Sequence, residues 1–133
     1  QIVRKALGGI MDEQDEALFA KIVQILQEHR HTEWIDIHNM RIQQFGAHLH
    51  IDAHITLPYY YSLKEAHQEM EKVIKLLAQK VDRTIEFNFH MDYCKDFSCE
   101  LCSINCDLRK KPFVKTIIWN EKNMASVSKH KLN

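Results

Sequence analysis

The clearest periodic pattern in the chain lies between residues 48 and 57, where polar and apolar side chains alternate without a break. A period of two residues predicts a β-strand with one face in the core and the other face turned away from it. The apolar face comprises Leu49, Ile51, Ala53, Ile55 and Leu57, and the polar face comprises His48, His50, Asp52, His54 and Thr56.

A second segment with the same period predicts another strand at residues 84–92, where Ile, Phe, Phe and Met alternate with Glu, Asn, His and Asp. A third strand is expected at residues 33–44, although its apolar pattern changes phase between Ile37 and Met40. One extra residue resets the phase of a strand, so we expect a β-bulge near His38 and Asn39.

Two helices are expected on either side of the first pair of strands. Asp12 is a good N-cap for a helix that carries a wide apolar stripe and ends near residues 29–31. Ser62 and Glu65 form the Ser-x-x-Glu capping box of a second helix, which ends at about Lys80.

The expected element order is therefore αββαβ. Three strands with one apolar face each, and two helices to cover that face, predict an α+β fold, a two-layer ferredoxin-like sandwich that lacks one edge strand. Its three-stranded sheet has both helices on one face, and a Cys-rich C-terminal extension follows. The polar face of the sheet must then meet water, a metal ion or a partner subunit.

The composition is that of one ordinary domain with two unusual residue counts. Of the 133 residues 45% are hydrophobic, which suffices for one core, and 18 Lys and Arg balance 18 Asp and Glu. Zero net charge argues against non-specific electrostatic binding of nucleic acid by the chain as a whole. The apolar runs are far too short to cross a bilayer. Nine His and four Cys stand out, because both residue types bind metal ions.

The balanced total hides an asymmetry along the chain. Residues 107–133 hold seven Lys and Arg against two Asp and Glu, so residues 1–106 hold 11 against 16. We expect an acidic domain at residues 12–93, then a Cys-rich extension at 94–119 with a short strand or docking segment, and a flexible tail at 120–133.

Imidazole nitrogen and carboxylate oxygen, which Zn²⁺ and its neighbours prefer as ligands, recur on the polar face of the predicted sheet. Residues two apart on a strand share a face, which pairs Asp52 with His54 and His90 with Asp92. If the two strands are neighbours, the pairs lie together and His38 can join them. Surface histidines are usually just solvated, so the pattern alone leaves a metal site and a solvated face both open.

Five pieces of this pattern also carry a family resemblance by their order and spacing. They are residues 38–41 (His-Asn-Met-Arg), Gly46, 51–55 (Ile-Asp-Ala-His-Ile), 62–67 (Ser-Leu-Lys-Glu-Ala-His) and 89–92 (Phe-His-Met-Asp). Together they resemble the cytoplasmic C-terminal domain of cation diffusion facilitator transporters, the proton-coupled exporters of Zn²⁺, Fe²⁺ and related divalent ions. The similarity covers about residues 7–92.

The resemblance implies a set of metal ligands. Residues at four of the matching positions bind metal ions in family members that possess a full set: His38, His54, His90 and Asp92. His67 matches a histidine that contributes to the same binuclear cluster near the dimer interface. The ion would be zinc or another divalent cation such as iron, manganese, cobalt or cadmium.

The match is incomplete at three positions. Asn39 stands where the family often has an acidic residue, which bears on the ligands of the second metal ion. His50 and Asp52 match no family ligand, so they are candidates for supporting or surface roles.

The resemblance also implies a function, that of a cytosolic metal-sensing and dimerisation domain of a divalent cation efflux transporter. Two copies would form a homodimer, and metal that binds only the closed arrangement would stabilise it by its differential affinity. Residues 1–11 would link the domain to the transmembrane part of the same polypeptide. The fragment itself would be soluble and lie on the cytoplasmic side of the inner (plasma) membrane.

The cysteine segment, Cys94-x4-Cys99-x2-Cys102-x3-Cys106, lies outside the family pattern. Four thiolates this close could bind one Zn²⁺ as a second metal site. Disulfides, which a cytosolic domain disfavours, and inert buried thiols are the alternatives. The first three spacings match the plant-type iron–sulfur pattern, but there the fourth cysteine is remote.

Three rival functions remain open on the sequence. A free-standing metal chaperone of the same fold would hand its ion to another protein. A zinc-dependent nucleic-acid-binding module could use the cysteines with basic residues 109–111, although no aromatic residues are interleaved there and the His-rich face would go unexplained. A small metallohydrolase is the third. No nucleophile–base arrangement or phosphate-binding Gly loop is visible, so we expect no enzyme activity.

Overall fold

The structure is a computed structural model that describes residues 15–132, so the expected N-cap at Asp12 and the linker at 1–11 lie outside the described residues. None of the helices within residues 15–132 is both long and apolar enough to span a lipid bilayer. The elements are α2 (Asp15–His29), β1 (Asp36–Phe45), β2 (His48–Leu57), α3 (Leu63–Lys80), β3 (Thr84–Tyr93), η1 (Asp96–Leu101) and α4 (Glu121–Ala125).

The three strands form one mixed sheet in the order β1-β2-β3. The tight turn at Gly46, with a φ of 59°, joins β1 to its antiparallel neighbour β2. The long crossover through α3 makes β3 parallel to β2. The register of β1 shifts between His38 and Arg41, where Asn39 has a φ of 51°, so the predicted bulge is confirmed.

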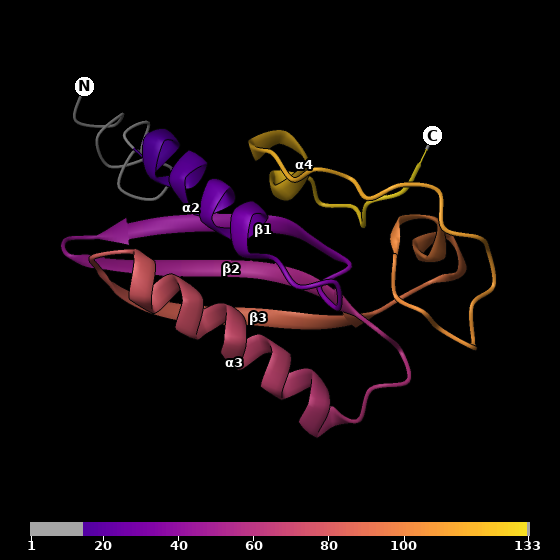
Figure 1. Cartoon of the computed structure of the whole chain (residues 1–133). Helices are drawn as coiled ribbons and strands as arrows, with labels where there is room; N and C mark the ends of the chain where they lie inside the picture. Colours follow the sequence, from indigo (N-terminus) through magenta and orange to yellow (C-terminus); the bar gives the residue numbers. More distant parts are fainter. Residues whose placement is uncertain (1–14, 133) are drawn as a thin grey trace.

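Both long helices cover the same face of the sheet, as Figure 1 shows. The apolar side chains of β2 are the centre of the core, and Ile51 and Ile55 are fully buried between the sheet and the helices. Ile22 of α2 and Leu77 of α3 are likewise 0% exposed and belong to the same cluster. The predicted α+β, ferredoxin-like arrangement is thus confirmed.

The capping box that opens α3 has the expected hydrogen bonds. The Glu65 backbone N–H donates to the Ser62 hydroxyl at 3.1 Å, and the Ser62 backbone N–H donates to the Glu65 carboxylate at 2.9 Å. Two of the N–H groups that a helix start leaves unpaired are satisfied in this way, so α3 begins where the sequence predicts.

Residues 113–119 form no strand, and the end of this irregular segment docks against α2, where the Trp119 N–H donates to Gln27 Oε1 at 2.9 Å. Trp119 is 3% exposed, and the Arg30 guanidinium lies 3.6 Å from the centroid of its ring. Arg30 also donates to the Ile117 carbonyl at 2.9 Å. Burial lowers the pKa of Arg30 to about 10, against the opposing charge of Asp36.

The segment expected as a flexible tail is instead folded against β1 and α2 through residue 132, as Figure 1 shows. Met124 of α4 is fully buried in the core cluster. The Asn39 backbone N–H at the bulge donates to the Ser126 carbonyl at 2.6 Å. Isolated anchors of this kind leave no periodic pattern in the sequence, which is why the expectation of a loose tail differs from the structure.

Candidate metal centre

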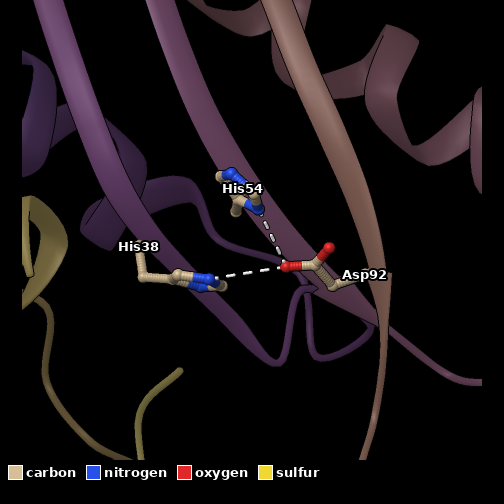
Figure 2. Close-up of side chains that lie close together, drawn as sticks. All are labelled: His38, His54 and Asp92. Carbon is tan, nitrogen blue, oxygen red and sulfur yellow. Dashed lines mark hydrogen bonds and ion pairs between the residues drawn. The ribbon is translucent and has the colours of Figure 1, made fainter. Parts of the chain in front are cut away.

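Three of the predicted ligands converge on one point of the polar face, where β1, β2 and β3 are adjacent (Figure 2). His38 and His54 are paired residues of β1 and β2, and Asp92 stands two residues beyond His90, which pairs with His54 on β3. The Asp92 Oδ2 atom lies 3.0 Å from His54 Nδ1 and 3.4 Å from His38 Nε2. We call these residues the His38–His54–Asp92 group.

The spacing of the three donor atoms suits a divalent cation. Each residue offers one ligand atom, and these atoms all lie within 4.8 Å of one another. A tetrahedral Zn²⁺ with bonds of about 2.0–2.1 Å separates its ligand atoms by about 3.3 Å. The two N···O distances bracket that value, so an ion can enter the group with little movement of the side chains.

Asp36 holds His38 in place, and sequence reasoning missed it. Its Oδ1 atom lies 2.7 Å from His38 Nδ1 and accepts from the Thr56 hydroxyl at 2.9 Å. Asp36 is 0% exposed, and this contact fixes the ring so that Nε2 points toward Asp92. Metal-binding histidines usually have such a carboxylate on the other nitrogen. The signal was available, because residues 36 and 38 share a face of the strand.

The remaining two predicted ligands lie outside the His38–His54–Asp92 group. The His90 ring is exposed and stacks on that of His54, with centroids 4.6 Å apart. His67 projects from α3, on the helical side of the sheet, and pairs with Glu71 at 2.8 Å. His90 is thus a neighbour that could turn toward an ion, whereas His67 is remote from the group within one chain.

Lys129 already supplies a positive charge to the group, which the sequence did not predict. Its Nζ atom lies 3.1 Å from the same Oδ2 atom of Asp92 that faces the two histidines. Burial alone would raise the pKa of Asp92, but the hydrogen bonds from His54 and Lys129 and the Lys129 charge outweigh it and lower that pKa. The carboxylate is therefore held in the anionic form that binds cations.

His130 closes the side of the group next to Asp36. Its backbone N–H donates to Asp36 Oδ2 at 3.1 Å, and its ring centroid lies 6.4 Å from that of His38. Burial lowers the pKa of His130, against the opposing effect of the Asp36 charge. Nothing in the local sequence marks residues 129 and 130, because they reach the group from more than 35 positions away.

The other polar residues of β2 form a separate cluster. His50 Nε2 lies 3.3 Å from Asp52 Oδ1, to which the Asn88 side-chain amide also donates at 2.9 Å. The pairing of Asp52 with His54 that the sequence suggested is therefore not made: Asp52 bonds to His50 and Asn88, and His54 bonds to Asp92.

A second set of possible ligands, which was not predicted, lies between the end of α2 and α3. His31, Glu33 and Glu69 also place one ligand atom each within 4.8 Å of the others. However, the Glu69 carboxylate accepts from Trp34 Nε1 at 3.1 Å and from Lys72 at 2.7 Å. Both Glu69 oxygens are thus engaged, whereas the contacts of Asp92 with His38, His54 and Lys129 all fall on Oδ2, so this set is a weaker candidate than the His38–His54–Asp92 group.

The four cysteines are close in space, away from the His38–His54–Asp92 group. All four are free, and all line one small cavity beyond the end of β3. Burial raises the pKa of the Cys94 and Cys102 thiols. The structure therefore keeps two chemically different sets of potential ligands apart, one of imidazole and carboxylate and one of thiols.

A comparison with protein families finds one match over more than half of the chain. The family described as "Cation efflux protein, cytoplasmic domain" matches residues 14–94. That range contains all five predicted imidazole and carboxylate ligands but only the first of the four cysteines. No curated protein matches the chain.

Solved structures with the same fold include a putative zinc transporter, a magnetosome protein and a metal-bound transporter domain. CzrB is 19% identical, with a TM-score of 0.51, over 56% of this chain and 90% of its own. The MamB C-terminal domain of Desulfamplus magnetovallimortis BW-1 is 13% identical, with a TM-score of 0.50 and the same two coverages. The metal-bound C-terminal domain of the CzcD transporter from Thermotoga maritima is 22% identical, with a TM-score of 0.53, over 61% of this chain and 92% of its own.

Proposed function

Because the chain belongs to the family of cation efflux protein cytoplasmic domains, we propose that it senses cytosolic metal and dimerises as part of a proton-coupled divalent cation efflux transporter. The family is one of transporter domains rather than enzymes. The domain would lie on the cytoplasmic side of the inner (plasma) membrane, where residues 1–11 would join it to the transmembrane domain of the same polypeptide.

The observation that carries this proposal is the convergence of His38, His54 and Asp92 on one point. Two imidazoles and a carboxylate suit zinc and also accept iron, manganese, cobalt or cadmium. Asp92 and His54 are partly exposed, with side-chain exposures of 23% and 30%, so an ion can reach them from solvent. A site that solvent reaches can report the free metal concentration, whereas a closed structural site cannot.

The open edge of the sheet supports dimerisation. β3 lies at an edge, and its apolar side chains at positions 85, 87, 89 and 91 are only partly buried. The corresponding side chains of β2 are 0–2% exposed. An incompletely covered apolar surface next to an edge strand is typical of a face that another chain covers.

Dimerisation would also give the two outlying ligands a role. His67 and Glu71 are more than half exposed on α3 and are joined only to one another among the ion pairs of the described residues. In a homodimer a second chain could bring ligands near His67, and His90 could turn toward an ion held by His54. Metal that bridges such positions only in the closed dimer would stabilise closure by its differential affinity.

Lys129 would set the metal concentration at which the group binds an ion. Its ammonium lies on the Asp92 oxygen that an ion needs, so metal and Lys129 compete for one carboxylate. An entering ion would displace Lys129 and weaken the hold of the C-terminal segment on the sheet. The ion would then be sensed both at the group and in residues 120–132.

Calorimetric titration with Zn²⁺ tests this function on the wild type, on Asp92→Asn and on Asp52→Asn. The second variant is a matched control, because Asp52 is also a partly exposed carboxylate on the polar face. We expect Asp92→Asn to lose zinc binding at this site and Asp52→Asn to keep it. Equal binding by all three proteins would contradict the ligand assignment and with it the proposed function.

A further inference from the structure

The Cys-rich extension is the part of the chain that the proposed function leaves unused. Its four cysteines fall within thirteen consecutive residues, from Cys94 to Cys106, and mostly outside the family match. All four line a single cavity of about 20 Å³. The other lining residues include Tyr60 and Arg109. Four thiols thus surround one small space at the end of β3.

The extension has little apolar core of its own. Between residues 94 and 118 the only regular element is η1, and Leu101 is the one large apolar side chain that is nearly fully buried. Trp119, at the end of the extension, belongs to the core of the main domain. Leu108, Phe113 and Val114 are each more than 40% exposed. Small units that bury so little apolar surface are commonly stapled by disulfides or a structural metal ion.

Arg109 arranges the backbone around the cavity. Its guanidinium donates to the carbonyls of Cys99 and Cys102 at 2.6 Å each and of Ile104 at 2.7 Å. These three bonds hold the loop in a closed curve, with a fixed positive charge beside the cysteines. The Arg109 charge opposes the burial that raises the pKa of the Cys102 thiol.

Two of the sulfur atoms already accept backbone hydrogen bonds. The Tyr59 N–H donates to Cys94 Sγ at 3.4 Å, and the Lys110 N–H donates to Cys99 Sγ at 3.5 Å. Backbone donors aimed at sulfur stabilise negative charge on it. One donor, Tyr59, follows β2 and the other, Lys110, lies in the basic segment, so both hold the cavity in place.

We propose that the four cysteines bind one structural Zn²⁺, independent of the His38–His54–Asp92 group. On binding, each thiol releases its proton to solvent, and its thiolate sulfur coordinates the ion. Four thiolates around one Zn²⁺ carry a net charge of −2, which the positive charge of Arg109 partly offsets. The size of the cavity is consistent with one bound ion. About 20 Å³ is close to the space of one water-sized sphere, which suits a single ion and not a cluster of several atoms.

Ion binding must also contract the loop. Among residues 15–132, no three of the cysteine sulfurs lie within 4.8 Å of one another. Tetrahedral zinc with Zn–S bonds of about 2.3 Å requires sulfurs about 3.8 Å apart. Zinc therefore pulls the four cysteine sulfurs together and makes the extension more rigid. Protease resistance of the extension gives the test a second readout.

The test uses the reduced, metal-free chain and adds Co²⁺, then Zn²⁺, while sulfur-to-cobalt charge-transfer absorption and reaction with a thiol reagent are followed. Four proteins are compared: wild type, His54→Ala, Cys99→Ser/Cys106→Ser and the neighbouring control Ser103→Ala. Cys99 and Cys106 are only partly buried, so their replacement spares the core. Protease resistance of the extension is measured with and without zinc.

We expect strong charge-transfer absorption in the wild type, in His54→Ala and in Ser103→Ala, and loss of both the band and one bound ion per chain in the cysteine variant. Zinc should displace cobalt, protect the thiols from the reagent and slow proteolysis of the extension. Thiols that react equally with and without zinc, or disulfides found by mass before reduction, would overturn the proposal. The result for His54→Ala separates this site from the proposed sensing function.

Discussion

Asp36 shows how far the candidate metal centre depends on a residue that would not itself touch the ion. Its carboxylate is fully buried and is shared between His38 Nδ1, the Thr56 hydroxyl and the backbone of His130. The contact selects the His38 nitrogen that faces Asp92, because one ring nitrogen is engaged by the carboxylate and the other is left for the ion.

Asp36→Asn should therefore weaken zinc binding by about 10- to 100-fold, the usual effect of removing the support of a ligating histidine. The physical reason is that an amide no longer holds the His38 ring by charge, so its orientation and basicity change. Titration calorimetry measures the affinity, and circular dichroism establishes that the variant is folded. Asp82→Asn, at an exposed position, is the control. An unchanged affinity in folded Asp36→Asn would refute the role of Asp36.

Lys129→Ala should have the opposite effect and strengthen zinc binding. The ammonium that competes for Asp92 Oδ2 at 3.1 Å is removed, while the ligands remain. A partly exposed ion pair contributes up to about 1 kcal/mol, so the gain should be about two- to fivefold. Competition with a zinc-sensitive dye measures it, with exposed Lys122→Ala as the control. A weaker affinity in Lys129→Ala would show that Lys129 supports the site rather than competes for it.

For single residues, the sequence predicted which candidate ligands come together better than it predicted their surroundings. The period of two residues placed His54 and the His90–Asp92 pair on polar strand faces, and the structure joins His54 to Asp92. Lys129 and His130 could not be predicted, because a lysine–carboxylate contact across more than 35 residues has no local signature. Such contacts follow from the fold as a whole.

Among the elements, the bulge in β1 does most to shape the site. It lets Ile37 and Met40 both enter the core, although an unbroken strand would place them on opposite faces. Asn39 accommodates the extra residue with a φ of 51°, in the left-handed region that favours glycine and tolerates asparagine. The same turn presents the Asn39 N–H to the Ser126 carbonyl, so it also anchors the C-terminal segment.

A comparison of Asn39→Ala with Asn39→Gly tests this conformation. Both variants lose the side-chain amide, and they differ only by the Cβ atom that the left-handed region disfavours. The free energy of unfolding of Asn39→Ala should be lower than that of Asn39→Gly by about 1 kcal/mol. Urea denaturation measures the difference. If the alanine variant proves the more stable of the two, the bulge does not hold the left-handed conformation described above.

The elements divide into those that the sequence specifies locally and those that it does not. α3 and β2 have a capping box and an unbroken alternation, and both were predicted from these alone. The course of residues 113–132 was not predicted, because it depends on single buried side chains whose partners lie far along the chain. These side chains are Trp119, Met124 and His130. Periodicity detects repeated burial and cannot detect one buried side chain at a time.

On the scale of the whole molecule, the basic C-terminal segment folds back onto the acidic domain, and His130 makes that contact sensitive to pH. The His130 Nε2–H donates to the Asn123 carbonyl at 2.8 Å, whereas Nδ1 is buried without a partner. A proton on Nδ1 would therefore have no acceptor, which agrees with the pKa that burial lowers below its usual 6.5.

The stability conferred by this contact should consequently fall in acid. His130 of the unfolded chain takes up a proton near pH 6.5, whereas in the folded chain its lowered pKa keeps it neutral at that pH. The stabilisation that His130 contributes is therefore complete above pH 6.5 and is lost as the pH falls toward the pKa of His130 in the folded chain. Urea unfolding at about pH 7.5 and about pH 5.5 measures the difference. His130→Gln should reduce the pH dependence, and exposed His48→Gln should leave it unchanged. Identical slopes in the two variants would contradict the assignment to His130.

An ion at the His38–His54–Asp92 group should draw two copies of the chain together. Small-angle X-ray scattering of the dimer, without metal and with saturating zinc, measures this closure. We expect the radius of gyration to decrease when zinc is added to the wild type, to increase again with a chelator, and to stay constant for Asp92→Asn. An unchanged scattering profile in the zinc-saturated wild type, or the same decrease in Asp92→Asn, would contradict it.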